Sequence, residues 1–310
     1  MKSGFLAATP PSPVGQTVGD GRVLRHPDKI LAVVSDVDGT LVNDRKILTD
    51  RCRRAVEQLR ERGIAFAIVS SRPPRGMAAL IKPLGLTTPM AGFNGGLLVT
   101  PQLIPLEEHL LAADAARRTV ATLTTHGADV WVFTGQDWLV RDRNGVNVDR
   151  EIMTVGFEPI VVKDFGQALD ATAKIVGVSD DPDLLSRCQS DLDAQLSGHA
   201  NIVRSQRYYL DITHPMANKG AALLAIAKQL RIPPAAIAVI GDGANDMAMF
   251  GPSGLSIAMG NAEPQVQSAA DHVTGRNDDE GFAQAMEQFI LNRSNPGGGD
   301  EPSSSTGDLP

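Results

Sequence analysis

The stretch Ile30-Leu-Ala-Val-Val-Ser-Asp36-Val-Asp38-Gly39-Thr40 joins a continuous apolar run to two carboxylates and a glycine. Such a run is typical of a strand that is covered on both faces of a parallel sheet. Residues two apart in extended chain point to the same side, so Asp36 and Asp38 share a face at the carboxyl end of this strand. Open α/β sheets bind their ligands at that edge. The stretch therefore predicts an α/β sheet with a polar site at its edge.

The same style of sequence continues on both sides of a long middle segment. Apolar runs predict strands at 30–35, 64–69, 236–240, 255–258 and 272–274. Amphipathic or Ala/Leu-rich segments predict helices at 49–62, 77–83, 220–230, 245–250, 264–270 and 281–291. Residues 90–99 are expected to turn at Asn94-Gly95-Gly96. Strands that alternate with helices predict an α/β fold with a parallel sheet and right-handed crossovers.

The middle of the chain follows a different order. Its pattern predicts a helix at 107–126, a hairpin at 130–141, a strand at 174–178, a helix at 182–196 and a second hairpin at 202–212. This order indicates a separate α+β domain that is inserted into the first. The predicted divisions are an irregular arm at 1–28, core at 29–104, the insert at 105–208, core at 209–292 and a disordered tail at 293–310.

Composition excludes several classes of partner. The 310 residues include 29 Lys and Arg against 36 Asp and Glu, a net charge of −7. The chain therefore lacks the excess of positive charge that nucleic-acid binding needs. It also lacks a basic run suited to an anionic membrane surface. No segment approaches the roughly 20 apolar residues that span a bilayer. Cys52 and Cys188 make no disulfide framework, so we expect reduced thiols and a cytoplasmic protein of open oligomeric state.

Asp36 and Asp38 are the first candidates for chemistry. One carboxylate can attack phosphorus and the other can move a proton, while a hard cation neutralises charge. A solvated Asp turn is the simpler alternative. An EF-hand loop does not fit, because Thr40 and Leu41 occupy its fifth and sixth positions and Ile47 replaces the closing Glu.

A second strand end carries the same kind of residues. Residues 236–240 run into Gly241-Asp242-Gly243-Ala244-Asn245-Asp246. Asp242 can complete a metal site with Asp36, and Asn245 and Asp246 can orient water, phosphate or a lysine. Asp246 at the sixth position of this run argues against a dinucleotide-binding loop. Turn and N-cap roles for these residues stay open.

Two further segments supply hydroxyls and cations. Ser70-Ser71-Arg72 follows the strand at 64–69, where hydroxyls and amides can bind phosphoryl oxygens. Lys219 opens the helix before the Asp242 strand and can balance a carboxylate-rich pocket. Caps, turns and a solvated lysine are the alternatives for these residues taken singly.

Together and in this order, these motifs resemble the haloacid dehalogenase superfamily. The insert and the run Pro89-Met-Ala-Gly-Phe-Asn94-Gly-Gly resemble its Cof-type phosphatases with a C2B cap, over about residues 29–292. The resemblance implies a Rossmann-like parallel-sheet core with an inserted α+β cap that selects the substrate. It implies Mg²⁺-dependent hydrolysis of small phosphate monoesters, such as sugar phosphates or related metabolites, through an aspartyl phosphate. A phosphomutase and a non-catalytic metabolite sensor are the rival functions.

The resemblance also implies a role for each matching position. Asp36 is the expected nucleophile and Asp38 the general acid and base, with Lys219 as the third catalytic residue. The expected Mg²⁺ ligands are Asp36, Asp38 through its backbone carbonyl, and Asp242, supported by Asp246. The expected substrate and phosphate contacts are Ser70, Ser71, Arg72, Asn94, Lys219 and Asn245. Ser71 stands where the subfamily usually has Gly, and we expect its side chain to crowd the phosphate.

Overall fold

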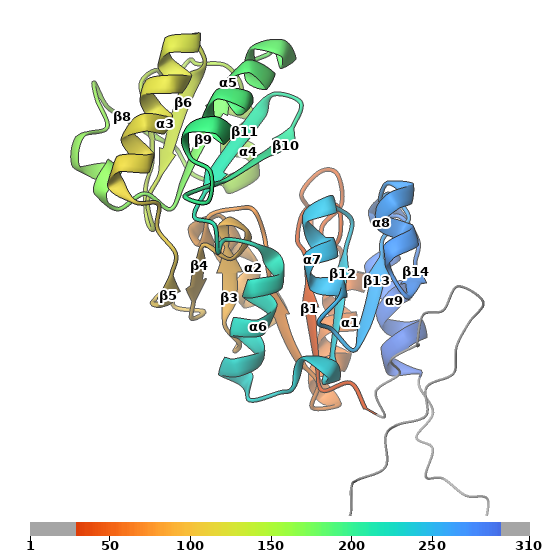
Figure 1. Ribbon diagram of the computed structural model, residues 1–310. Coiled ribbons are helices and arrows are strands. Elements are labelled where there is room, and N and C mark those ends of the chain that lie inside the picture. The colour runs from red at the N-terminus through yellow and green to blue at the C-terminus, as the bar shows by residue number, and fades with distance from the viewer. Residues whose placement is uncertain (1–28, 293–310) are drawn as a thin grey trace, which may run out of the picture.

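A computed structural model describes residues 29–292 of the chain (Figure 1). The predicted N-terminal arm and C-terminal tail lie outside the described residues. The core contains a five-stranded parallel sheet in the order β14-β13-β12-β1-β2. Its strands are β1 Ala32–Ser35, β2 Ala65–Ile68, β12 Ile237–Gly241, β13 Leu255–Ala258 and β14 His272–Val273. The α/β class predicted from the alternating pattern is confirmed.

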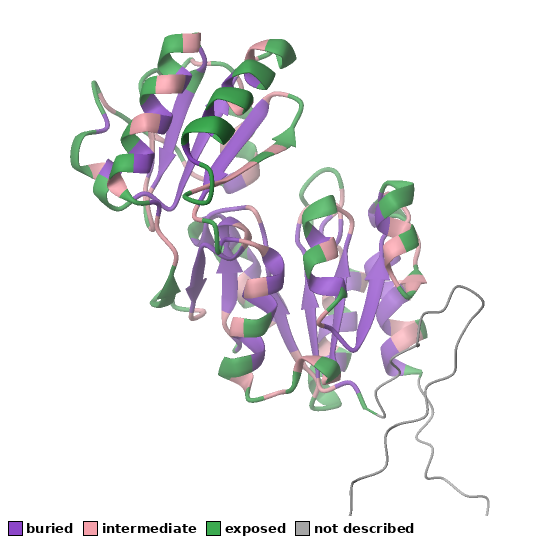
Figure 2. Cartoon of the chain, in the orientation of Figure 1, coloured by how far each residue is buried: buried purple, intermediate pink, exposed green. Residues whose placement is uncertain are grey.

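Helices cover both faces of this sheet. One face packs against α1 Asp50–Glu61, α2 Ala78–Leu84 and α9 Gly281–Ala285, which continues as a π-helical turn η7 Met286–Leu291. The other face packs against α6 Lys219–Leu230, α7 Met247–Phe250 and α8 Pro264–Ala269. Successive strand residues point to opposite sides, so Val33 joins the first apolar cluster and Val34 the second. The strands β1, β12 and β13 are buried along their whole length (Figure 2).

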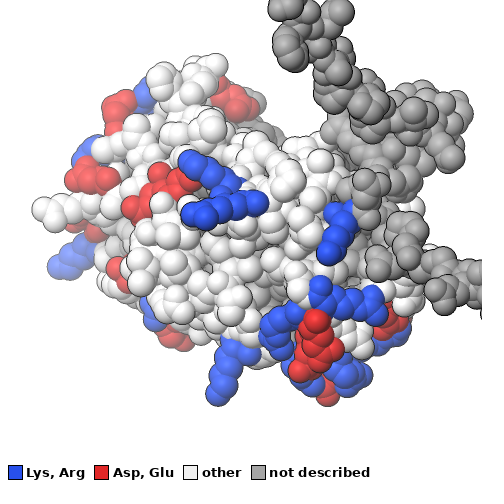
Figure 3. Space-filling view, turned by 90° about the horizontal axis from the view of Figure 1, so that it is seen from below, with Lys and Arg blue, Asp and Glu red and all other residues white. Residues whose placement is uncertain are grey.

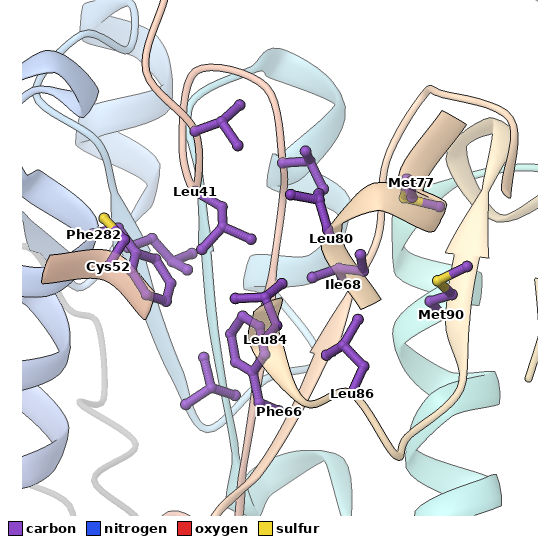
Figure 4. Close-up of a cluster of buried hydrophobic side chains, with 14 of the residues drawn as sticks. Leu41, Cys52, Phe66, Ile68, Met77, Leu80, Leu84, Leu86, Met90 and Phe282 are labelled. Atoms are coloured by element: carbon purple, nitrogen blue, oxygen red, sulfur yellow. The ribbon is translucent and has the colours of Figure 1, made fainter. Parts of the chain in front are cut away.

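Helix α1 illustrates how the sequence forms these layers. The Thr49 hydroxyl caps its first turn by accepting a hydrogen bond from the Cys52 amide at 3.2 Å. Its buried side chains are spaced for one helical face and join one apolar cluster of the core, of which Cys52 is labelled in Figure 4. Leu59 is fully buried there. Truncating Leu59 to Ala would cost about 2–5 kcal/mol, because neighbouring helices cannot close around the cavity.

A small antiparallel sheet extends the core toward the insert. It consists of β3 Met90–Gly92, β4 Leu97–Val99 and β5 Pro105–Glu108, and the Val69–Ala91 bridge joins it to the main sheet. The predicted helix at 107–126 is therefore wrong at its start, since α3 spans only Ala113–His126. Pairing of β5 with β4 outweighs the local preference of Glu107 and Glu108 for a helix.

The insert forms a second domain, hereafter the cap. Its sheet has the order β10-β11-β9-β6-β7-β8. Its elements are β6 Asp129–Phe133, β7 Trp138–Val140, α4 Val148–Val155, β8 Ile160–Val161, β9 Lys174–Val178, α5 Pro182–Gln195, β10 Asn201–Gln206 and β11 Tyr209–Thr213. Helices α3 and α5 pack on one face of this sheet. Residues 105–108 form β5, which pairs with the core, and residues 209–213 form β11, which pairs with the cap. By strand pairing, the cap therefore begins after residue 108 and extends to residue 213, whereas the predicted limits are 105–208.

The cap rests on the core above β3, β4 and α2 (Figure 1). The rings of Phe93 in the core and Phe133 in the cap lie 5.8 Å apart, and the Arg75 guanidinium lies 4.3 Å from the centroid of the Phe157 ring. Within residues 29–292, no helix combines the length and apolar character needed to cross a membrane. On the face seen in Figure 3, Lys and Arg side chains form several separate groups.

Candidate active site

The candidate site lies where β1, β2 and β12 end. The Asp36 amide donates a hydrogen bond to the Ile240 carbonyl at 2.9 Å, which continues the β1–β12 pairing up to the site. Gly39 has a φ of +77°, and a Cβ there would lie 2.3 Å from the Asp242 Oδ2. Only glycine combines this left-handed backbone with so close a neighbour. The glycine after the two aspartates thus lets Asp242 approach the Asp36 turn.

Lys219 links the two strand ends. Its side chain is only 2% exposed, and its Nζ lies 2.5 Å from Asp36 Oδ1 and 2.6 Å from Asp246 Oδ1. Burial alone would lower the pKa of Lys219, but the Asp246 and Asp36 carboxylates raise it. Burial also raises the pKa of Asp36 well above its usual range, although Lys219 opposes the shift. Lys219 alone therefore does not offset the cost of burying the Asp36 charge.

Asp246 organises the second turn. Its Oδ2 accepts hydrogen bonds from the amides of Asp242 at 3.0 Å and Gly243 at 2.8 Å, while Oδ1 is held by Lys219. A Cβ on Gly241 would lie 2.3 Å from the Asp246 Cγ, so glycine is needed here too. Both Asp246 oxygens are thus occupied, and the carboxylate supports the turn and Lys219.

Three carboxylates at this edge could hold a cation. Oxygens of Asp36, Asp242 and Asp246 lie within 4.8 Å of one another. Asp242 accepts hydrogen bonds from the Thr40 hydroxyl at 3.2 Å and the Asn261 amide at 3.1 Å. Burial and the neighbouring Asp246 raise the pKa of Asp242 to about 6, a cost that a bound cation would relieve. Hard oxygen donors of this kind fit Mg²⁺, with Asp36 and Asp242 better placed than Asp246 to supply them.

The Asp38 carboxylate pairs with two cations and is not part of that cluster. Arg72 holds it with two parallel contacts of 2.6 Å, from Nε to Oδ2 and from Nη2 to Oδ1. Lys46 adds an ion pair at 2.7 Å. Burial alone would raise the pKa of Asp38, but Arg72 and Lys46 lower it. Any metal contact by Asp38 would therefore come from its backbone carbonyl, and Arg72, predicted as a substrate contact, holds Asp38.

The remaining predicted phosphate contacts lie on neighbouring loops. The buried Ser70 hydroxyl accepts a hydrogen bond from the Arg72 amide at 3.1 Å. Ser71 is half-buried and does not have a positive φ, so its backbone does not require glycine. Asn94 has a φ of +58°, and its Oδ1 accepts a hydrogen bond from Asn245 Nδ2 at 2.9 Å. The fold thus brings together two predicted contacts that are 151 positions apart.

Sequence reasoning missed two residues of this site. Lys46 lies on the loop after Asp38 in a left-handed conformation with a φ of +63°. Asn261 follows β13 and donates to both Asp242 and the Gly39 carbonyl, the latter at 2.9 Å. The apolar strand at 255–258 was the available signal for Asn261, because polar residues after it reach the same sheet edge. No local pattern marked Lys46.

The geometry defines the class of site. Two strand-end carboxylates, a buried lysine and a third carboxylate meet at the ligand-binding edge of a parallel sheet, where anion and cation can be bound together. A family model described as haloacid dehalogenase-like hydrolase matches residues 33–286. The chain belongs to this family.

Individual relatives agree with that assignment. The 5-amino-6-(5-phospho-D-ribitylamino)uracil phosphatase YcsE of Bacillus subtilis is 24% identical over 270 residues, covering 87% of this chain and 99% of that protein. The crystal structure of a haloacid dehalogenase-like hydrolase from Bacteroides thetaiotaomicron superposes on this structure with a TM-score of 0.78 at 27% sequence identity. The superposition covers 84% of this chain and 100% of that one. A subclass IIB sugar phosphatase of the superfamily has a TM-score of 0.74 at 19% identity, over 83% and 98% of the two chains, and shows the shared fold. The predictions of the family and of a phosphoric monoester hydrolase are confirmed.

Proposed function

We propose that this protein hydrolyses phosphate monoesters of small metabolites, such as sugar phosphates, with Mg²⁺ and through an aspartyl phosphate on Asp36. The observation that carries the proposal is the buried Lys219, which bridges Asp36 and Asp246 beside Asp242. The Bacillus subtilis relative, whose name specifies a phosphorylated ribityl compound, supports a substrate of this size.

Asp36 is the nucleophile in this proposal. Lys219 holds Oδ1, which leaves Oδ2 to attack phosphorus while the bond from phosphorus to the leaving oxygen breaks. Asp38 gives a proton to that leaving oxygen. Because Arg72 and Lys46 lower the pKa of Asp38, the incoming phosphate must draw one of these cations away, so that Asp38 can take up a proton from solvent before it acts as an acid.

The second half returns the enzyme to its starting state. Asp38 takes a proton from a water molecule, which attacks phosphorus and breaks its bond to the Asp36 oxygen. Mg²⁺ bound by Asp36, Asp242 and the Asp38 carbonyl would neutralise phosphoryl charge. Ser70, Ser71, Asn94 and Asn245 would donate hydrogen bonds to the phosphoryl oxygens.

Two rival functions make different predictions. A phosphomutase with the same intermediate would need a bisphosphate to sustain turnover, whereas the phosphatase releases phosphate without one. A non-catalytic sensor would bind a phosphorylated metabolite without turnover. Asp38, held by two cations, argues for the enzyme, because a sensor has no need of an acid and base.

The test is phosphate release from a panel of phosphorylated metabolites, with Mg²⁺, with Ca²⁺ and after chelation. We expect release with Mg²⁺, little with Ca²⁺ and none after chelation, because Ca²⁺ takes more and longer oxygen contacts. Denaturation of the enzyme in acid during turnover should trap phosphate bound to the protein. Hydroxylamine should then remove this phosphate, as expected for an acyl phosphate. Full turnover after exhaustive chelation, or with a bisphosphate only, would contradict the proposal.

A cytoplasmic location is also part of the proposal. Cys52 and Cys188 are both buried and free, as expected of thiols in a reducing compartment. Alkylation of the denatured protein, taken directly from cells, would measure their redox state, and a disulfide in that sample would contradict the location.

A further inference from the structure

The cap carries a buried polar cluster that the proposed chemistry does not use. The face of its sheet opposite α3 and α5 is mostly apolar and aromatic, and includes Trp131, Phe133 and Trp138. Two charged side chains interrupt that face: Lys174 on β9 and Asp211 on β11 are 8% and 4% exposed. Buried charges of this kind are costly unless they are paired and hydrogen-bonded.

This pair is incompletely satisfied. Lys174 Nζ lies 2.6 Å from Asp211 Oδ2 as an ion pair. Within the described residues, however, no donor is oriented to hydrogen-bond either Asp211 oxygen. The hydroxyl of the neighbouring Tyr209 lies beside the Glu151 carboxylate but without the geometry of a regular hydrogen bond. Buried polar groups in native proteins almost always have partners. A missing partner that donates hydrogen bonds to Asp211 would complete the cluster.

The cluster faces the candidate active site. Lys174 Nζ lies 6.0 Å from the Phe133 ring centroid, and Phe133 contacts Phe93, the residue before Asn94. On another side, Glu151 of α4 interacts electrostatically with Lys174 and Asp211 and also with Asp38. The cluster therefore lies on the side of the cap that faces Asp38.

Helix α4 holds Glu151 in that position. It packs against the short helix η1, Pro74–Met77, which follows Arg72 in the core. A Cβ on Gly76 would lie 3.3 Å from the Val155 Cα, so the two backbones approach closely. Movement of the cap would therefore carry Glu151 and the buried pair away from Asp38 together and admit the substrate.

We infer that Lys174, Asp211 and Tyr209 form the subsite for the leaving group, and that it selects a neutral, polyhydroxylated group. This inference rests on the proposed phosphatase function. Hydroxyls can donate to both Asp211 oxygens and accept from Lys174 and Tyr209, as vicinal hydroxyls of a polyol or sugar do. A leaving group with its own anionic end would meet two carboxylates, Asp211 and Glu151. Of the nearby cations, Lys174 is already paired with Asp211, and Arg150 is held against the Tyr208 ring and hydroxyl.

Three esters of equal chain length test the subsite: glucitol phosphate, hexyl phosphate and phosphogluconate. The wild-type enzyme should show the highest kcat/KM for glucitol phosphate, because hexyl phosphate lacks the hydroxyls and phosphogluconate ends in a carboxylate. Asp211→Asn should reduce the ratio of kcat/KM between glucitol phosphate and hexyl phosphate by about tenfold or more, the cost of losing hydrogen bonds to a charged group. The same variant should raise kcat/KM for phosphogluconate relative to kcat/KM for glucitol phosphate.

Two further variants make the result decisive. Asp193→Asn on the exposed side of α5 is the matched control and should keep the wild-type ratios. Lys174→Met combined with Asp211→Leu replaces the pair by apolar side chains, a change that buried ion pairs often tolerate. It should lose the preference for glucitol phosphate and keep a cooperative thermal transition, so it covers the case in which Asp211→Asn does not fold.

The outcomes separate the subsite from the proposed function. If no ester releases phosphate with Mg²⁺, the proposed function fails. If the wild-type enzyme cleaves hexyl phosphate as well as glucitol phosphate, or if the double variant keeps the wild-type ratio, the chemistry stands and the subsite is wrong. Water would then be the partner that completes Asp211.

Discussion

Two buried lysines, one in each domain, have very different surroundings. Lys219 in the core is 2% exposed and contacts two carboxylates at 2.5 and 2.6 Å, and backbone amides occupy the remaining oxygen of Asp246. Lys174 in the cap is 8% exposed and has one carboxylate partner, whose oxygens lack oriented donors. The core cluster is thus assembled before a substrate arrives, whereas the cap cluster is incomplete without one.

This difference matches the separate demands of chemistry and selection. Groups that stabilise a transition state work best when they are fixed in advance. Groups that discriminate between substrates gain from being unsatisfied until the correct one binds, because a wrong substrate then leaves buried polar atoms unpaired. The same kind of buried ion pair can therefore serve reaction in one domain and specificity in the other.

Asp36→Asn should have the largest effect of all single changes. Removing the nucleophilic charge should lower kcat by about a thousandfold or more. The fold should persist, because Asp246 still pairs with Lys219. Phosphate release and a thermal melt measure the two effects. Activity near that of the wild type would contradict the role of Asp36 as nucleophile and of the core cluster as the catalytic one.

Lys219→Met should damage activity and stability together. It leaves Asp36 and Asp246 buried without their cation, which should cost about 3–5 kcal/mol in the free energy of unfolding. Lys174→Met should have a similar cost, because it isolates Asp211, but it should retain far more activity on hexyl phosphate. Denaturant unfolding and kcat/KM for both variants give the comparison. Equal loss of activity in the two variants would show that the domains do not divide the work in this way.

Asn261→Ala should weaken metal binding. Its amide orients Asp242 and the Gly39 carbonyl, and loss of such a supporting contact typically costs 10–100-fold in metal affinity, so we expect about tenfold weaker Mg²⁺ binding. The measurements are the Mg²⁺ dependence of kcat and, without substrate, calorimetric titration with Mg²⁺. The exposed Gln265→Ala on α8 is the control. Unchanged affinity would mean that Thr40 alone positions Asp242.

The core positions could be predicted from sequence because each follows its own strand. Asp36, Ser70 and Asp242 stand directly after apolar runs, and parallel strands bring such positions to one edge. Lys46 could not be predicted, because its contact with Asp38 depends on a left-handed turn that no local pattern marks. The role of Arg72 also required the structure, since only the fold shows that its guanidinium is paired with Asp38.

The cap was harder to predict than the core for similar reasons. Helix α4 has only 8 residues and begins after Asn147, a residue in the left-handed region whose side chain does not cap the helix. The usual start signals are therefore absent, and Glu151 was missed with the helix. Lys174 fell in a correctly predicted strand, but its pairing with Asp211 joins residues from different strands. Such contacts follow from sheet order, which the sequence did not reveal.

The connections between the two domains give the smallest expected effect. His109 follows β5 and His214 follows β11, and their rings stack 5.5 Å apart at an interplanar angle of 18°. His214 Nδ1 accepts a hydrogen bond from the Met216 amide at 3.1 Å, which requires that nitrogen to be unprotonated. Burial and the neighbouring His109 lower the pKa of His214 below its usual value of 6.5.

The sign of the pH effect follows from that shift. The unfolded chain takes up a proton on His214 near pH 6.5, whereas the folded chain resists protonation until a lower pH. The contribution of His214 to stability is therefore complete above the unfolded pKa and is lost as the pH falls through 6.5 and below. When the pH falls from neutral to mildly acidic, the Tm of His214→Gln should decrease less than the Tm of the wild type. The two decreases should differ by up to about 3 °C. His199→Gln, at an exposed histidine in the cap, should keep the wild-type pH dependence. If His214→Gln keeps it too, the stacked histidines do not couple the domain connections to pH.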